Sequence, residues 1–359
     1  MAENHDSAKM PVTVITGFLG SGKTTLLNHL LSSPDMADTA VVINEFGEIS
    51  LDHLLVETSI ENTLILQSGC ICCTVRGDLV DTLTDLLTKR GQKLVPAFSR
   101  VAIETTGIAE PGPILQTLAT HALLAPRFYV RAVVTTVDAV NGQGQLESFG
   151  EAVQQAVLAD IIVLTKTDLA QPDTVDRLKR NLHRINPSAS ILDVLNGAIS
   201  SQQLFEHAPA DPKAAPEKLD RWLALEQFDG HDHESHDHAG HDHAGHDHAH
   251  HNDLNRHGDD IRAFSVVVDE AITWSNLESW LGSLLSLRGK DLLRIKGILN
   301  VVDQPGPVVV HAVQHLLHPI SRLRRWPSED RRSKIVFITR NIPPEALRNS
   351  LYAHLTPKA

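Results

Sequence analysis

The stretch Val12-Thr-Val-Ile-Thr16, followed at once by Gly17-Phe-Leu-Gly-Ser-Gly-Lys23-Thr24, decides the fold of this 359-residue chain. A short β-branched run leads into glycines and then into leucines at helical spacing, and the glycine segment matches the pattern G-x-x-x-x-G-K-[ST]. Glycines let successive backbone N–H groups point at phosphate oxygens, and a helix that begins there adds its positive N-terminal end. The stretch therefore predicts a strand, a phosphate-binding loop and a helix.

Each residue type in this loop has an expected role. Lys23 would supply a positive charge to the β- and γ-phosphates, and the Thr24 hydroxyl would reach Mg²⁺. A chance glycine turn is the alternative, but it does not explain the strand and the helix on either side. The residues expected to contact a nucleotide here are Gly17, Gly20, Ser21, Gly22, Lys23, Thr24 and Thr25.

A second marker is a strand that ends in a carboxylate, Val101-Ala-Ile-Glu104, with Gly107 three residues later. We expect Glu104 to orient Mg²⁺-bound water and to act with Lys23 in catalysis. The Gly107 N–H group would lie near the γ-phosphate. Acidic residues often end strands, so the marker gains its meaning from the loop that precedes it.

A third marker, Thr165-Lys166-Thr167-Asp168, resembles the Asn-Lys-x-Asp sequence with which GTPases read guanine. The Asp168 carboxylate would accept hydrogen bonds from the base, and the stem of Lys166 would pack on its ring. Thr165 replaces the usual Asn, which puts one contact to the base in doubt. We predict GTP rather than ATP; the alternative is a loop with an ordinary Lys/Asp pair.

Short apolar strands alternate with amphipathic helices through the first half of the chain. Strands are expected at 12–16, 40–43, 63–66, 101–104, 132–137 and 161–165, and helices between them, one of them capped by Asp173. This order predicts an α/β fold with a doubly wound, mostly parallel sheet. The predicted domains are a P-loop GTPase domain at 1–225, a His-rich disordered linker at 226–258, and a small α+β domain at 259–359.

The C-terminal domain has its own pattern. Strands are expected at 261–268, 292–299, 308–313 and 335–339, and helices at 274–285 and 343–355. His311, His315 and His318 fall near the third of these strands, and we interpret them as ordinary structural histidines.

Composition excludes several classes of protein. The net charge of −12 argues against nucleic-acid binding, and no apolar run is long enough to cross a membrane. The N-terminal segment is polar, without the apolar centre of a signal peptide, so we expect a cytoplasmic protein.

All three cysteines of the chain, Cys70, Cys72 and Cys73, lie within four residues. This is a poor disulfide framework, whereas three thiolates from one turn suit Zn²⁺ and also Co²⁺, Ni²⁺ or Cu(I). Three protein ligands would leave one coordination position open for transfer. The alternative is that the cysteines pack as small apolar residues.

A histidine-rich segment adds a second metal-binding element. Eleven of the 21 histidines lie between His231 and His257, mostly as His-x-His. Neutral imidazoles at this density bind Zn²⁺, Ni²⁺, Cu²⁺ or Co²⁺ weakly and lose affinity as they are protonated. We interpret the segment as a buffer that raises the local metal concentration; an inert polar linker is the alternative.

Together these motifs resemble the CobW-like family of P-loop GTPases, metallochaperone relatives of the hydrogenase and urease nickel-insertion GTPases. The resemblance covers nearly the whole chain, and its cysteine segment looks like the branch linked to zinc delivery. The most specific pieces are Gly17–Thr25, Asn44–Glu48, Gly69–Thr74, Glu104–Gly107, Val137–Ala139 and Arg294–Gly297.

The resemblance implies a mechanism. Thr24 and Glu45 would lie at Mg²⁺, and Asn44 to Glu57 would be a switch segment ordered by the γ-phosphate. GTP would bring the three cysteines together around the metal, with Glu48 as an additional oxygen ligand. Hydrolysis would loosen the site and pass the metal to a client metalloprotein. A homodimer is compatible with this scheme and is not required by it.

Two other functions remain open. One keeps the GTPase and changes the cargo to Co²⁺ for cobalamin synthesis, or to cobalt or iron for a nitrile hydratase. The other is a metal-storage protein whose nucleotide site only gates binding. Thiolate and imidazole ligands accept several of these ions, so ligand type does not separate them.

Overall fold

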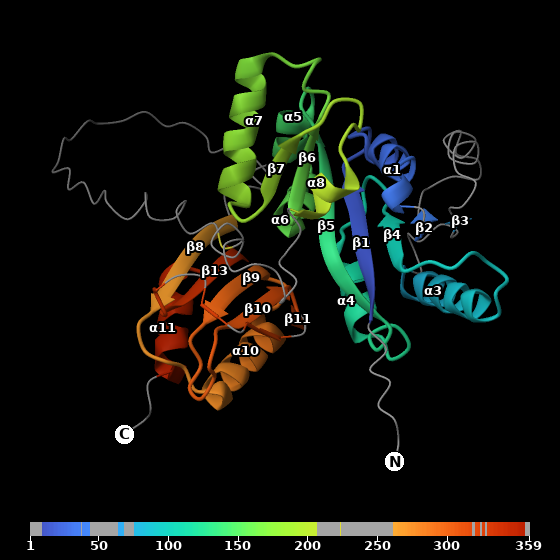
Figure 1. Ribbon diagram of the computed structural model, residues 1–359. Helices are drawn as coiled ribbons and strands as arrows, with labels where there is room; N and C mark the ends of the chain where they lie inside the picture. The colour runs from blue at the N-terminus through green and yellow to red at the C-terminus, as the bar shows by residue number, and fades with distance from the viewer. Residues whose placement is uncertain are drawn as a thin grey trace, which may run out of the picture.

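The computed structural model describes residues 9–36, 38–43, 64–67, 75–206, 223, 261–317, 320–323, 325–326 and 329–355. These residues form two domains, an α/β domain from the N-terminal half and an α+β domain from the C-terminal part of the chain (Figure 1). Several predicted site residues lie outside the described residues. They are Glu45, Glu48, Cys70, Cys72, Cys73 and the histidines of the segment 231–257.

Within the described residues, seven strands of the first domain form one sheet in the order β3-β2-β4-β1-β5-β6-β7, and every neighbouring pair is parallel. The chain starts at the centre, moves to one side and then crosses to the other, so the predicted doubly wound parallel sheet is confirmed. The strands are β1 (Met10–Gly17), β2 (Thr39–Ile43), β3 (Leu64–Gln67), β4 (Arg100–Glu104), β5 (Phe128–Asp138), β6 (Ile161–Thr165) and β7 (Ser190–Asp193).

Both faces of this sheet are buried, and its strands are accordingly apolar on both sides. On β6, Ile162 and Leu164 face one cluster of helices, whereas Ile161 and Val163 face the other. Helices α3 (Val75–Gly91), α4 (Gly112–Thr120), α5 (Gly142–Ser148), α6 (Gly150–Leu158) and α7 (Pro172–Ile185) contribute to the first cluster. Helices α1 (Lys23–Leu31) and α8 (Ser201–Glu206), with the short η1 (Pro34–Met36), contribute to the second.

The prediction that Asp173 caps a helix is wrong. Helix α7 begins at Pro172, Gln171 occupies the N-cap position, and no side chain caps the first turn. Proline is favoured at the first helical position because the N–H group that it lacks has no partner within the helix. Asp173 lies inside the first turn, where its charge still suits the positive end of the helix.

The C-terminal domain is a second sheet covered on one face by two helices. In the part of the chain that is described, its order is β11-β10-β9-β13-β8, antiparallel throughout, and β12 pairs with β10. Helices α10 (Trp274–Arg288) and α11 (Pro344–Leu355) cover it. The strands are β8 (Ile261–Val268), β9 (Leu292–Leu299), β10 (Val308–Val313), β11 (Leu316–Leu317), β12 (Ser321–Arg322) and β13 (Ser333–Arg340).

The other face of the second sheet packs against the first domain. Leu293, Val313 and Ile338 belong to the same apolar core as the helices of the first domain. Figure 1 shows β8, β9 and β13 lying next to α6 and the end of α7. Leu223, from the segment between the domains, is buried against the second sheet beside Ile298.

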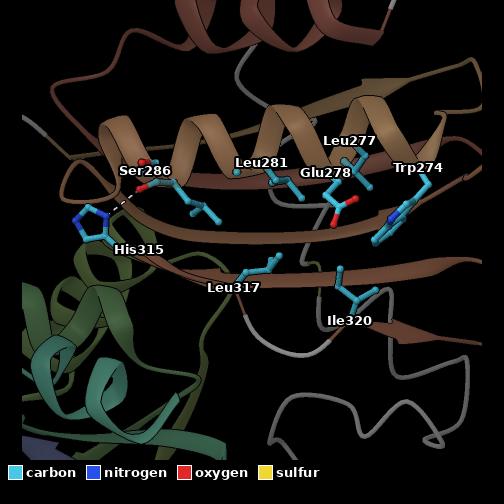
Figure 2. A pocket seen from close by; sticks show the side chains of 10 residues that line it. Trp274, Leu277, Glu278, Leu281, Ser286, His315, Leu317 and Ile320 are labelled. Atoms are coloured by element: carbon cyan, nitrogen blue, oxygen red, sulfur yellow. Dashed lines mark hydrogen bonds between the residues drawn. The ribbon is translucent and has the colours of Figure 1, made fainter. Parts of the chain in front are cut away.

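A groove of about 350 Å³ runs along α10 in the C-terminal domain (Figure 2). Leu277 and Leu281 line it on the helix side, and Leu317 lines it on the side of β11. At one end, the ring of His315 forms a hydrogen bond of 2.8 Å between Nδ1 and the carbonyl oxygen of Leu285. His315 thus has the structural role that was predicted for it.

Among the described helices, none combines the length and apolar character needed to cross a membrane.

Candidate nucleotide-binding site

The predicted nucleotide-contacting residues gather at one edge of the first sheet. Because β1, β4, β5 and β6 are parallel, their carboxyl ends meet there. Gly17, Glu104, Asp138 and Thr165 are the last residues of these four strands. Loops at such an edge are where α/β sheets carry their binding groups.

The glycine loop has a backbone that other residues would not adopt. Gly20 and Gly22 have φ of +70° and +90°, and a side chain on Gly17 would overlap the Thr136 hydroxyl and carbonyl oxygens. Gly22 is the N-cap of α1, where no side chain caps the first turn and no acidic residue occupies it. The N–H groups of that turn therefore face the loop without a competing side-chain acceptor, which suits an anion.

Lys23 is held inside this loop. Its side chain is 7% exposed, and Nζ donates to the carbonyl oxygens of Gly17 at 3.0 Å and Phe18 at 3.1 Å. Phosphate oxygens would form stronger, charge-assisted bonds with this ammonium than these neutral carbonyl oxygens do. The geometry therefore keeps Lys23 beside the position where a phosphate would enter.

Thr24 and Glu104 connect the loop to the end of β4. Thr24 Oγ1 donates to Glu104 Oε1 at 2.8 Å, and the Glu104 side chain is 1% exposed. A hydroxyl and a carboxylate are oxygen ligands of the kind that Mg²⁺ prefers. Their adjacency beside the glycine loop fits the predicted metal ion. Glu45, the other residue expected at Mg²⁺, lies outside the described residues.

The segment 104–111, called the sensor loop below, packs tightly on the glycine loop. An added Cβ at Gly107 would lie 2.8 Å from both N and Cα of Leu19. No residue larger than glycine fits there without moving backbone. Gln155 Nε2 donates to the carbonyl oxygens of Gly107 at 3.1 Å and Ala109 at 3.0 Å.

Lys166 bridges the predicted base-reading loop and the glycine loop. It has φ of +57°, and Nζ donates to the Gly20 carbonyl oxygen at 2.8 Å and to Asp138 Oδ2 at 2.7 Å. Burial alone would raise the pKa of Asp138. Hydrogen bonds from Lys166 and Asn141 and from the Val140 and Asn141 N–H groups outweigh it, so the pKa lies below its usual value. Asp138 is thus an ionised anchor for Lys166.

The hydroxyl of Thr165 forms internal hydrogen bonds. Thr165 Oγ1 donates to the carbonyl oxygen of Ser21 at 2.8 Å, and Ser21 Oγ lies 2.6 Å from Thr136 Oγ1. In this structure the residue that replaces Asn ties two loops together. Asp168 and Thr25 have exposed side chains at the same edge.

Asp138 and Gln155 are site residues to which sequence analysis assigned no role. Asp138 was visible in the motif Val137–Ala139, although its pairing with Lys166 was not. For Gln155, the available signal was an amide inside an otherwise apolar helix, which must find a hydrogen-bond partner when buried. His121, at the C-terminal end of α4, accepts a hydrogen bond from the Leu123 N–H at 3.3 Å.

Comparison with known proteins agrees with this architecture. Residues 11–193 match the nucleotide-binding domain described as CobW/HypB/UreG, and residues 261–355 match the cobalamin synthesis protein cobW C-terminal domain. The chain is 33% identical over 337 residues to the zinc chaperone YjiA of Escherichia coli, covering 94% of this chain and 96% of that protein. It is 29% identical to the zinc chaperone CobW of Pseudomonas aeruginosa, covering 96% and 91%.

Among solved structures, the chain is similar to the Zn(II)-bound YjiA GTPase from E. coli. The TM-score is 0.67 at 29% identity, over 97% of this chain and 99% of that one. The similarity spans both domains, as the resemblance seen in the sequence motifs led us to expect. The chain therefore belongs to the CobW/HypB/UreG family, with a nucleotide-binding domain followed by a CobW C-terminal domain.

Proposed function

We propose that this protein is a metallochaperone that hydrolyses GTP to GDP and phosphate and delivers Zn²⁺ to a client metalloprotein. One observation carries the proposal: Thr24 of the glycine loop and Glu104 of β4 meet at 2.8 Å beside the buried ammonium of Lys23. This is the constellation that a Mg²⁺-nucleotide requires. The similarity to proteins named zinc chaperones supports the choice of cargo.

The first step is phosphate binding. Lys23 exchanges its bonds to the Gly17 and Phe18 carbonyl oxygens for bonds to phosphate oxygens, and the uncapped first turn of α1 adds N–H donors. Thr24 and Glu104 would hold Mg²⁺, and that ion would supply further positive charge to the phosphates.

Hydrolysis transfers the γ-phosphoryl group to water. The water oxygen bonds to phosphorus, the bond from phosphorus to the bridging oxygen breaks, and GDP leaves with that oxygen. Glu104 would orient the water, and the Gly107 N–H group would face the terminal phosphate. Most of the acceleration would come from positioning and charge, as is usual in phosphoryl transfer.

Base selection is assigned to the loop after β6. The exposed carboxylate of Asp168 accepts hydrogen bonds that guanine offers and adenine does not. Lys166 is fixed by Gly20 and Asp138, and its aliphatic stem forms a surface for the ring. The protein should therefore prefer GTP to ATP.

The metal would be held by Cys70, Cys72 and Cys73, with Glu48 as an oxygen ligand, and released when hydrolysis removes the γ-phosphate. Support comes from the chemistry of thiolates and from the relatives named above. The histidines of the segment 231–257 would raise the local metal concentration.

A transfer assay tests this function. Purified protein is loaded with Zn²⁺ and with GTP, GDP or a non-hydrolysable GTP analogue, and mixed with candidate apo-enzymes whose activity reports metal uptake. We expect transfer with GTP and little transfer with the analogue. Equal transfer from all three forms would contradict delivery driven by hydrolysis and favour metal storage, and a parallel series with Co²⁺ would identify a cobalt chaperone.

A further inference from the structure

Helix α6 carries two adjacent glutamines in a fully buried segment. From Ala152 to Leu158 every residue is buried, and Gln154 and Gln155 are the two polar ones. A buried amide is costly unless it forms hydrogen bonds. Consecutive helical residues point about 100° apart, so the two amides meet different neighbours.

Gln155 faces the sensor loop. Its Nε2 donates to the carbonyl oxygens of both Gly107 and Ala109, so the amide nitrogen must be the atom on that side. The backbone of Gln155 is fixed in turn, because Thr135 Oγ1 on β5 donates to its carbonyl oxygen at 2.8 Å. One side chain thus spans the part of the loop that is expected to contact the γ-phosphate.

Gln154 faces the C-terminal domain. With its amide oxygen turned toward β13, it accepts hydrogen bonds from the guanidinium group of Arg340. The C-terminal end of α6 is held by the same domain, because Arg294 Nη1 donates to the carbonyl oxygens of Leu158 at 2.7 Å and Ala159 at 2.8 Å. Helix α6 therefore touches the sensor loop on one side and the C-terminal domain on another.

A second contact lies at the C-terminal end of the same loop. The sensor loop continues directly into α4, which begins at Gly112, and a Cβ on Gly112 would lie 2.5 Å from Oε1 of Gln314. Gln314 belongs to the turn between β10 and β11 of the C-terminal domain. The sensor loop is thus held at Gly107 and Ala109 by α6, and its C-terminal end lies against the C-terminal domain.

We propose that Gln155 is a positioning residue for the sensor loop and that α6, through it, makes the nucleotide preference of the site depend on the C-terminal domain. The inference rests on the proposed GTP site. A client that displaced Arg340 or Gln314 would loosen the sensor loop and favour GDP over GTP. By reciprocity, GTP would change the affinity of the C-terminal domain for that client.

The main experiment measures the affinities of the full chain for a non-hydrolysable GTP analogue and for GDP. Gln155→Met removes two hydrogen bonds from the loop, so the preference for the triphosphate should fall about tenfold while GDP affinity stays unchanged. Gln155→Glu, which keeps the size but replaces the donor by oxygen, should do the same and serves if the first variant folds poorly. If Gln155 only supported the fold, its replacement would lower the affinities for both nucleotides equally.

Arg340→Met tests the connection to the C-terminal domain. Among the described residues, Arg340 contacts neither the glycine loop nor the sensor loop. We still expect the preference for the GTP analogue over GDP to fall about threefold, because α6 is less firmly held in this variant. The matched control is Ser350→Ala, which removes the 3.1 Å hydrogen bond to Trp280 Nε1 inside the C-terminal domain. This control should leave the preference unchanged.

The outcomes separate the two proposals. Wild-type protein that fails to bind GTP would contradict the proposed function. Wild-type protein that prefers the triphosphate, with the same preference in folded Gln155→Met and Gln155→Glu, would contradict the positioning role. An unchanged preference in Arg340→Met would contradict the link to the C-terminal domain.

Discussion

The two edges of the first sheet use buried charges in opposite ways. At the carboxyl edge, Glu104 and Asp138 end β4 and β5 among loops that can admit a ligand. At the amino edge, the carboxylate of Asp160 accepts a hydrogen bond from the Val133 N–H at 2.9 Å and pairs with Arg294 of the C-terminal domain. The first edge carries the proposed binding site, and the second edge forms a closed interface between domains.

Two buried lysines show the difference most clearly. Lys23 lies at the N-terminus of α1 inside a glycine loop, where an anion can take over its hydrogen bonds. Lys296 is 2% exposed and donates to the carbonyl oxygen of Ser188 at 3.1 Å, between the domains. Burial and the nearby charge of Arg294 lower the pKa of Lys296 well below its ordinary value. A buried cation thus indicates a ligand site only where the surrounding backbone can receive an anion.

The largest expected effect concerns the closed edge. Arg294→Met leaves the buried carboxylate of Asp160 without its cation and should lower the free energy of unfolding by about 3–5 kcal/mol. Urea denaturation measures this change. The double variant Asp160→Asn with Arg294→Met should recover most of the loss, because no buried charge is then left unpaired. A single variant as stable as the wild type would show that the interface does not depend on this pair.

The next largest effect concerns the open edge. Lys23→Met removes the charge expected to bind the phosphates, so GTP turnover should fall roughly 10²–10³-fold, as when other preorganised electrostatic groups are removed. Steady-state phosphate release measures it, and Lys89→Met, an exposed lysine on α3, is the control. Turnover that survives in Lys23→Met would mean that the glycine loop is not the catalytic site.

A pH experiment distinguishes the two lysines further. Unfolded Lys296 keeps its proton up to about 10.5, whereas folded Lys296 releases it at lower pH. Between these two pKa values the unfolded state binds more protons, so the free energy of unfolding gains a contribution as pH rises, and that contribution is lost as pH falls through the folded pKa. Lys296→Met should remove this pH dependence, whereas Lys290→Met should keep it. If the free energy of unfolding has the same pH dependence in both variants, Lys296 is not the group responsible for it.

The smallest effect tests the internal role of Thr165. Thr165→Val deletes the hydroxyl that donates to Ser21 and should cost about 1 kcal/mol of stability and a few-fold loss of GTP affinity. Thr165→Ser keeps the hydroxyl and should behave as the wild type. If the free energy of GTP binding changes by more than the free energy of unfolding in Thr165→Val, Thr165 contacts the nucleotide directly.

The positions of Glu104 and Gly107 relative to Lys23 could be predicted because parallel strands bring their carboxyl ends to one edge. The capping role predicted for Asp173 was wrong because Pro172 starts that helix. The contacts of Gln155 with Gly107, 48 residues away, depend on how α6 lies on the sheet. No local pattern encodes such a contact.

Control of the metal by the nucleotide is tested by measuring Zn²⁺ affinity in three states: with a non-hydrolysable GTP analogue, with GDP and without nucleotide. We expect Zn²⁺ to bind about tenfold more tightly with the GTP analogue than with GDP, within the range usual for coupled sites. Cys70→Ser, Cys72→Ser and Cys73→Ser combined should abolish the difference. Equal Zn²⁺ affinity in the three states of the wild type would contradict the claim that the nucleotide controls the metal.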